Sequence, residues 1–84
     1  MLDCRYSNQA QDFLKKANKD LARRLMTKIE QLLANPYPQG VRTIEGYKEK
    51  IFRVRIGDFR ILYEVDSKNN LLGVVKIDKR ARVY

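Results

Sequence analysis

The sequence predicts an α+β fold in which a small, mostly antiparallel β-sheet packs against an N-terminal helical hairpin. The chain has 84 residues, of which 44% are hydrophobic and 33% charged, a balance typical of one globular domain and a length that leaves no room for two cores. Hydrophobic residues follow helical spacing in the first half of the chain and alternate in the second half. We therefore expect a single domain over residues 1–84 with the element order β-α-α-β-β-β.

The first six residues alternate in polarity. Leu2, Cys4 and Tyr6 occupy one set of positions, and Asp3 and Arg5 occupy the other. This pattern predicts a short strand with one buried face, because successive side chains of a strand point to opposite sides. Cys4 falls on the apolar side, where we expect it to act as a small core residue.

Two helices are expected next. Ser7 is a suitable N-cap for the first, Asn18 interrupts the helical pattern, and Asn35-Pro36 ends the second helix because the residue before proline avoids helical geometry. The apolar positions with helical spacing are Ala10, Phe13, Leu14 and Ala17 in the first helix and Leu21, Leu25, Ile29, Leu32 and Leu33 in the second.

The second half of the chain predicts three strands. Residues 51–56 and 59–65 both alternate, and Gly57-Asp58 between them favours a tight hairpin turn. Residues 66–70 are polar and form a second turn, and residues 71–77 are an apolar run expected to be the last strand. We expect Tyr47 and Tyr63 to be packing residues.

The charge of the chain favours a polyanionic partner. Lys and Arg number 18 against 10 Asp and Glu, which gives a net charge of +8, and cationic proteins gain affinity by releasing counterions from nucleic acid phosphates. The chain has no histidine and one cysteine, so we expect neither a metal site nor a small-molecule cofactor. It has no apolar stretch of about 20 residues and no secretory signal, so we expect a cytoplasmic protein without a membrane partner.

Basic residues cluster around the predicted hairpin. Arg53 and Arg55 are two positions apart and so share one face of a strand, and Arg60 follows across the turn. Lys79, Arg80 and the terminal Tyr84 leave the last strand and could approach the same cluster. Such a patch can seat a phosphodiester with a stacked base. Arginines on the solvent face of a sheet are also common without any ligand, so both interpretations stay open.

These residues resemble a known family. The run Gly46-Tyr47, followed by residues 51–65 (IFRVRIGDFRILYEV) and by the ending Lys79-Arg80-Ala81-Arg82-Val83-Tyr84, is similar to RelE/ParE superfamily toxins, and the likeness spans essentially the whole chain. The resemblance implies the RelE-like fold and a toxin of a type II toxin–antitoxin system. It implies a cognate antitoxin protein as partner.

Within that superfamily, RelE-like members cut messenger RNA in the ribosomal A site, and ParE-like members poison DNA gyrase without nuclease chemistry. The resemblance matches Arg53, Arg55, Arg60, Arg80 and Tyr84 to the site residues of the RelE-like nucleases, which favours a ribosome-dependent endoribonuclease that inhibits translation. A ParE-like gyrase inhibitor and a non-catalytic RNA-binding module are the alternatives.

The implied reaction is attack of a ribose 2′-OH on the adjacent phosphate. Arginines suit the charge that builds on the phosphoryl oxygens, because guanidinium binds them bidentately and stays charged. Where many family members carry histidine or another titratable group, this chain has Arg55 and Lys79. Lys79 could accept a proton only if neighbouring cations favour its neutral amine, and Glu45 is a further candidate. The sequence therefore leaves the proton-transfer role unassigned.

Overall fold

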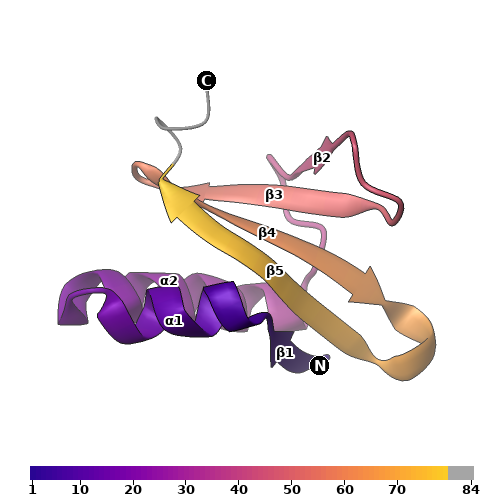
Figure 1. The fold of residues 1–84 in the computed structure, drawn as a ribbon. Coiled ribbons are helices and arrows are strands. Elements are labelled where there is room, and N and C mark those ends of the chain that lie inside the picture. The colour runs from indigo at the N-terminus through magenta and orange to yellow at the C-terminus, as the bar shows by residue number, and fades with distance from the viewer. Residues whose placement is uncertain (80–84) are drawn as a thin grey trace.

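The computed structural model describes residues 1–79, in which two helices lie against one side of a five-stranded sheet (Figure 1). The sheet has the order β1-β5-β4-β3-β2. β1 runs parallel to β5, and the other neighbours are antiparallel. The predicted α+β class and mostly antiparallel sheet are therefore confirmed. The elements are β1 (Asp3–Tyr6), α1 (Asn8–Lys16), α2 (Lys19–Ala34), β2 (Arg42–Ile44), β3 (Ile51–Ile56), β4 (Phe59–Asp66), the short 3₁₀ helix η1 (Ser67–Asn69) and β5 (Leu71–Lys79).

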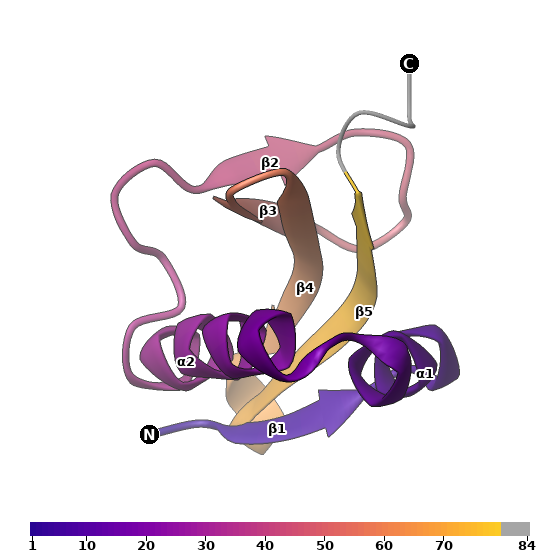
Figure 2. The same cartoon turned by 90° about the vertical axis from the view of Figure 1, so that its left-hand side faces the viewer.

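Both helices cover the same face of the sheet and leave the opposite face without a helical layer (Figure 2). The core lies between these layers, and its fully buried members include Leu25 and Ile29 of α2, Ile61 and Tyr63 of β4, and Leu72 of β5. Cys4 packs against this core as expected. Within residues 1–79, neither helix combines the length and apolar character that crossing a membrane requires.

The predicted helix boundaries follow from local hydrogen bonds. The Ser7 side chain accepts a hydrogen bond from the Ala10 amide (3.1 Å), and the Asn18 side chain accepts one from the Leu21 amide (2.8 Å). Each therefore satisfies an amide that has no partner within its helix. Asn35 ends α2, which confirms the stop expected before Pro36.

The strand β2 was not predicted from the sequence. Its three residues follow a loop that contains Pro38 and Gly40, and they pair with residues 51–53 at the start of β3. A strand this short carries too little alternation to be recognised from its pattern. Because β2 begins at Arg42, opposite Arg53, residues 54–56 of β3 have no strand partner on that side in the described part of the chain.

A β-bulge in β5 sets the register of the sheet. Val74 lies opposite Tyr63, whereas Lys76 lies opposite Leu62, so one extra residue sits in β5 between these pairs. β1 ends at Tyr6, opposite Val74 of β5. Beyond this point, side chains at the start of α1 make hydrogen bonds to the backbone of β5 in place of those from a strand. The Ser7 hydroxyl donates to the Val75 carbonyl (2.6 Å).

Gln9 supplies two more of these hydrogen bonds. Its side-chain amide donates to the Ile77 carbonyl (2.7 Å) and accepts from the Ile77 amide (2.9 Å). Ile77 is fully buried, and buried backbone groups are costly to leave unpaired. Gln9 therefore acts as a one-residue continuation of β1.

We predict that Gln9→Ala lowers the free energy of unfolding by about 1–3 kcal/mol, because two backbone groups of Ile77 lose their partner. Urea denaturation measures this loss. Gln11→Ala is the matched control, since Gln11 lies in the same helix and makes one exposed hydrogen bond to the Tyr6 carbonyl. Equal losses in the two variants would contradict the role given to Gln9.

Candidate nucleic-acid interface

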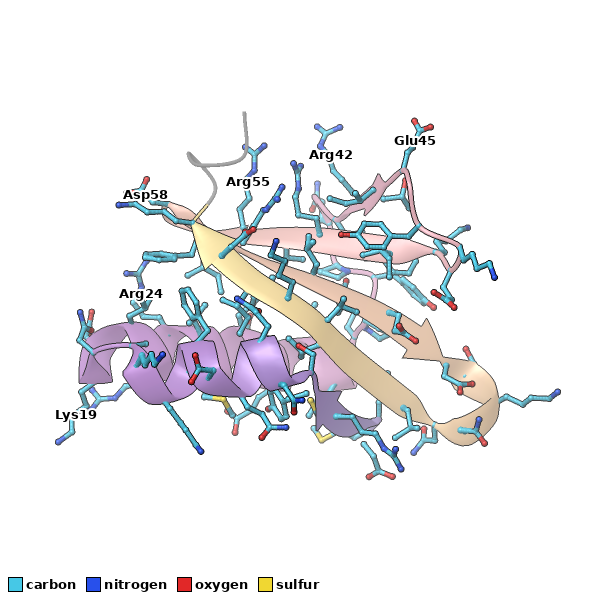
Figure 3. The ribbon with its side chains drawn as sticks, viewed as in Figure 1. Lys19, Arg24, Arg42, Glu45, Arg55 and Asp58 are labelled. Atoms are coloured by element: carbon cyan, nitrogen blue, oxygen red, sulfur yellow. The ribbon has the colours of Figure 1, made fainter. Side chains whose placement is uncertain are left out.

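The face of the sheet away from the helices carries a group of arginines. Arg55 of β3 lies directly opposite Arg60 of β4, and Arg53 of β3 lies directly opposite Arg42 of β2. Residues paired in this way share one face of the sheet. The side chains of Arg42 and Arg55 rise from the sheet on the side away from the helices (Figure 3). We call Arg42, Arg53, Arg55 and Arg60 the arginine face.

Two like-charged pairs side by side oppose folding, since like charges directly opposite on a sheet repel each other. Among the described residues, neither Arg42 nor Arg53 forms an ion pair with a carboxylate. The Nε atom of Arg53 is buried and has no hydrogen-bond partner there. This half of the arginine face therefore carries positive charge that no carboxylate of the described residues neutralises.

Arg60 differs from Arg42 and Arg53 because a carboxylate already holds it. Its Nε donates to Oδ1 of Asp78 (2.8 Å), and its Nη2 lies 3.4 Å from Oδ2. Arg60 is only 6% exposed, and Nζ of Lys76 lies 3.7 Å from the same Asp78 carboxylate. The sequence predicted Arg60 as a phosphate contact. The structure places it in a buried ion pair, because the bulge in β5 brings Asp78 opposite Arg60.

Lys79 does not join the arginine face. It lies opposite Phe59 in the register, and Phe59 packs edge-to-face on Phe13 of α1 with ring centroids 5.9 Å apart. The register therefore puts Lys79 on the helix-bearing face, and the expectation that it approaches the cluster is wrong. Arg80 and Tyr84 lie outside the described residues.

Two residues near β2 depart from the sequence-based expectations. Arg42 was missed as a site residue because β2 itself was missed. Tyr47 is 46% exposed, so its predicted role as a packing residue is wrong, whereas that of Tyr63 is confirmed. Glu45, the second candidate for proton transfer, follows β2 and points to the same side as Arg42 and Arg55 (Figure 3).

Aromatic contacts hold the loop between α2 and β2 against the sheet. The Tyr63 hydroxyl donates to the Pro36 carbonyl, and the Tyr37 ring packs edge-to-face on Phe52, 5.2 Å between centroids. Burial raises the pKa of Tyr63 to about 12, with a smaller contribution from Tyr37, so this hydroxyl remains a donor well above neutral pH. The loop thus has a fixed position beside Arg42 and Arg53.

The described residues suit anion binding better than metal binding. No three His, Cys, Asp or Glu side chains within residues 1–79 are grouped so that they could hold a metal ion. Arginine donates hydrogen bonds and stays charged at all physiological pH values. The arginine face can therefore bind phosphate oxygens and stabilise negative charge, while a proton acceptor must come from another residue type.

The sequence matches the ParE toxins of type II toxin–antitoxin systems (parDE) over residues 4–84. The chain belongs to this toxin family. It is also 36% identical over 58 residues to a protein named as a RelE1 toxin from Methanocaldococcus jannaschii. That match covers 67% of this chain and 64% of the relative, so it spans a little less than two thirds of the relative's length.

Solved structures place this family member among RelE-like folds. A chain of the RelE–RelB complex from Pyrococcus horikoshii is 26% identical with a TM-score of 0.82, and the match covers 98% of each chain. A chain of the intact Escherichia coli RelBE toxin–antitoxin complex is 15% identical with a TM-score of 0.81, over 94% of this toxin-family chain and 96% of that one. The second likeness concerns the fold alone. Together with the sequence match, they confirm the RelE/ParE resemblance.

We predict that Asp78→Ala destabilises this toxin-family domain by about 3 kcal/mol, because it removes the carboxylate that holds a buried guanidinium. Chemical denaturation measures the change. Asp12→Ala is the control, since the Asp12–Lys16 pair is exposed and such i,i+4 pairs contribute only about 0.5 kcal/mol. A loss in Asp78→Ala no larger than in the control would show that the Arg60–Asp78 pair does not stabilise the fold.

Proposed function

We propose that this chain is a ribosome-dependent endoribonuclease that cleaves messenger RNA in the A site and so inhibits translation. The observation that carries the proposal is the arginine face, which lies on the uncovered side of the sheet and has no carboxylate partner at Arg42 and Arg53 among the described residues. The net charge of +8 and the similarity to a RelE1 toxin support it. Membership of the toxin family agrees with it.

The proposed reaction is an internal transfer within the RNA. The 2′-oxygen attacks the adjacent phosphorus and loses its proton, and the bond from phosphorus to the 5′-oxygen breaks. The products are a 2′,3′-cyclic phosphate and a 5′-OH that has gained a proton. Arg53 and Arg55 would bind the phosphoryl oxygens, whose negative charge grows in the transition state. Arg80 and Tyr84 remain sequence-based candidates for a further phosphate contact and for base stacking.

Proton transfer in this scheme falls to a residue other than arginine. Glu45 is on the same side of the sheet as Arg42 and Arg55, so it is the described carboxylate that we propose as proton acceptor. Asp78 is unsuitable, because it already accepts hydrogen bonds from Arg60. Positioning of the RNA by the ribosome would supply much of the remaining rate enhancement.

We propose a cognate antitoxin protein as the partner that restrains this activity. The solved relatives from Pyrococcus horikoshii and Escherichia coli are toxin–antitoxin complexes. An antitoxin with an acidic segment would neutralise the arginine face, and charge complementarity of this kind also speeds association. We expect this antitoxin to contribute an amphipathic helix as well, which binds by its apolar side.

One observation favours a second function. The matching family is described by its ParE toxins, and the ParE-like members of the superfamily act on DNA gyrase. In this alternative, the arginine face would bind an acidic surface or DNA and no RNA would be cut.

We predict that Arg53→Gln lowers messenger RNA cleavage by about 100-fold or more, the usual effect of removing one donor to a transition-state oxyanion. The measurement is primer extension on a reporter message in a reconstituted translation system, with and without ribosomes. Lys19→Gln is the matched control, because it removes the same charge from an exposed position at the far end of α2 (Figure 3).

The same assay separates the alternatives. Cleavage by the parent and by Lys19→Gln, but not by Arg53→Gln, is the expected result. Intact message together with gyrase-dependent DNA breaks would replace the nuclease by the gyrase inhibitor. Salt-sensitive RNA binding without cleavage or growth arrest would leave a non-catalytic RNA-binding module.

A further inference from the structure

A hollow of about 330 Å³ lies at the edge of the sheet, and three members of the arginine face contribute to its lining. It is lined by Lys28 of α2, by residues 38–40 of the following loop, by Arg42 of β2 and by residues 53–55 of β3. It opens where β2 begins at Arg42, beside the part of the β3 edge that has no strand partner among the described residues. The hollow therefore joins the uncovered face of the sheet to the side of α2.

The lining of this hollow is strongly cationic. Four of its residues are Lys or Arg, and no Asp or Glu lines it within the described part of the chain. The buried Nε of Arg53 has no hydrogen-bond partner there. Lys28 reaches the hollow from a different element than the arginines, so an anion placed inside would meet positive charge from both the helix and the sheet.

The shape and composition of the hollow suit a phosphate group better than a nucleic acid base. No aromatic side chain lines it among residues 1–79, so it offers no surface on which a base could stack. Guanidinium and ammonium groups both suit phosphate oxygens. Gly40 has a positive φ of 89°, and a Cβ at this position would meet no atom within 4 Å, so the loop leaves space beside the cations. The volume suits one phosphate with its sugar, and an acidic protein segment would need a larger surface.

We propose that this hollow is a second phosphate subsite, which binds the RNA backbone where the strand leaves the arginine face and passes around the edge of β3. Lys28 and Arg42 hold the phosphate in this subsite, and Arg53, which lies opposite Arg42 on the neighbouring strand, connects the subsite to Arg55. This inference rests on the proposed RNA-binding function of that face. It assigns phosphate contacts to Lys28 of α2 and Arg42 of β2.

The test measures binding of a short single-stranded 2′-O-methyl oligoribonucleotide by fluorescence anisotropy over a series of KCl concentrations. This probe has no free 2′-OH and cannot be cleaved by the proposed reaction. We expect Lys28→Gln to reduce the slope of log K against log salt by about 0.7, the value for one lost phosphate contact on a single strand. Arg42→Gln should give a similar reduction, and the exposed Lys19→Gln should leave the slope unchanged.

Each outcome of this experiment either supports or overturns the proposed subsite. Unchanged slopes in both Lys28→Gln and Arg42→Gln, with circular dichroism confirming folded protein, would overturn the subsite. Unchanged slopes combined with loss of poly-glutamate binding would also overturn it, and would assign the hollow to an acidic protein. Reduced slopes in a chain that does not cleave messenger RNA would keep the subsite and reject the nuclease, so the two proposals fail separately.

Discussion

The placement of both helices on one face of the sheet is the constraint from which the surface chemistry follows. The helix-bearing face needs apolar side chains at alternate positions of β3, β4 and β5, and it buries residues such as Ile61 and Leu72. The other positions of the same strands then face away from the core, and several of them carry arginine. Because strands hold side chains at fixed spacing, these cations are arranged by the same hydrogen bonds that build the sheet. The stability of the fold and the arrangement of the arginine face thus depend on one register.

That register divides the arginines into two groups with different electrostatics. Near the turn of the β3–β4 hairpin, Arg60 is compensated by Asp78 on the neighbouring strand. One step toward β2, Arg42 and Arg53 face each other without a carboxylate from residues 1–79. The first group contributes to the fold, and the second carries positive charge that an anion can use. The single-residue bulge in β5 causes this difference, because it places Asp78 opposite Arg60.

Much of this arrangement was predictable from the sequence. Capping residues and alternation identify the helices, the β3–β4 hairpin and the common face of Arg53 and Arg55. Alternation states which face a residue occupies but not which strand it neighbours, so the parallel pairing of β1 with β5 and the Arg60–Asp78 contact stayed hidden. The buried positions of β5 are 72, 74 and 77, so the period of two breaks at the bulge, but the apolar run over residues 71–77 conceals this break in the sequence. Lys79 was misplaced for the same reason.

The parallel pairing of β1 and β5 has a consequence for biosynthesis. Asp3 pairs with Leu71. β1 is therefore translated first among the strands but can join the sheet only after β5 has been translated. Contacts of such long sequence separation form late, after the local hairpins. Until β5 has been translated, the sheet lacks the strand that joins β1 to β4. The arginine face therefore reaches its final geometry only after strands far apart in the sequence have paired, because Asp78 of β5 holds Arg60 in place.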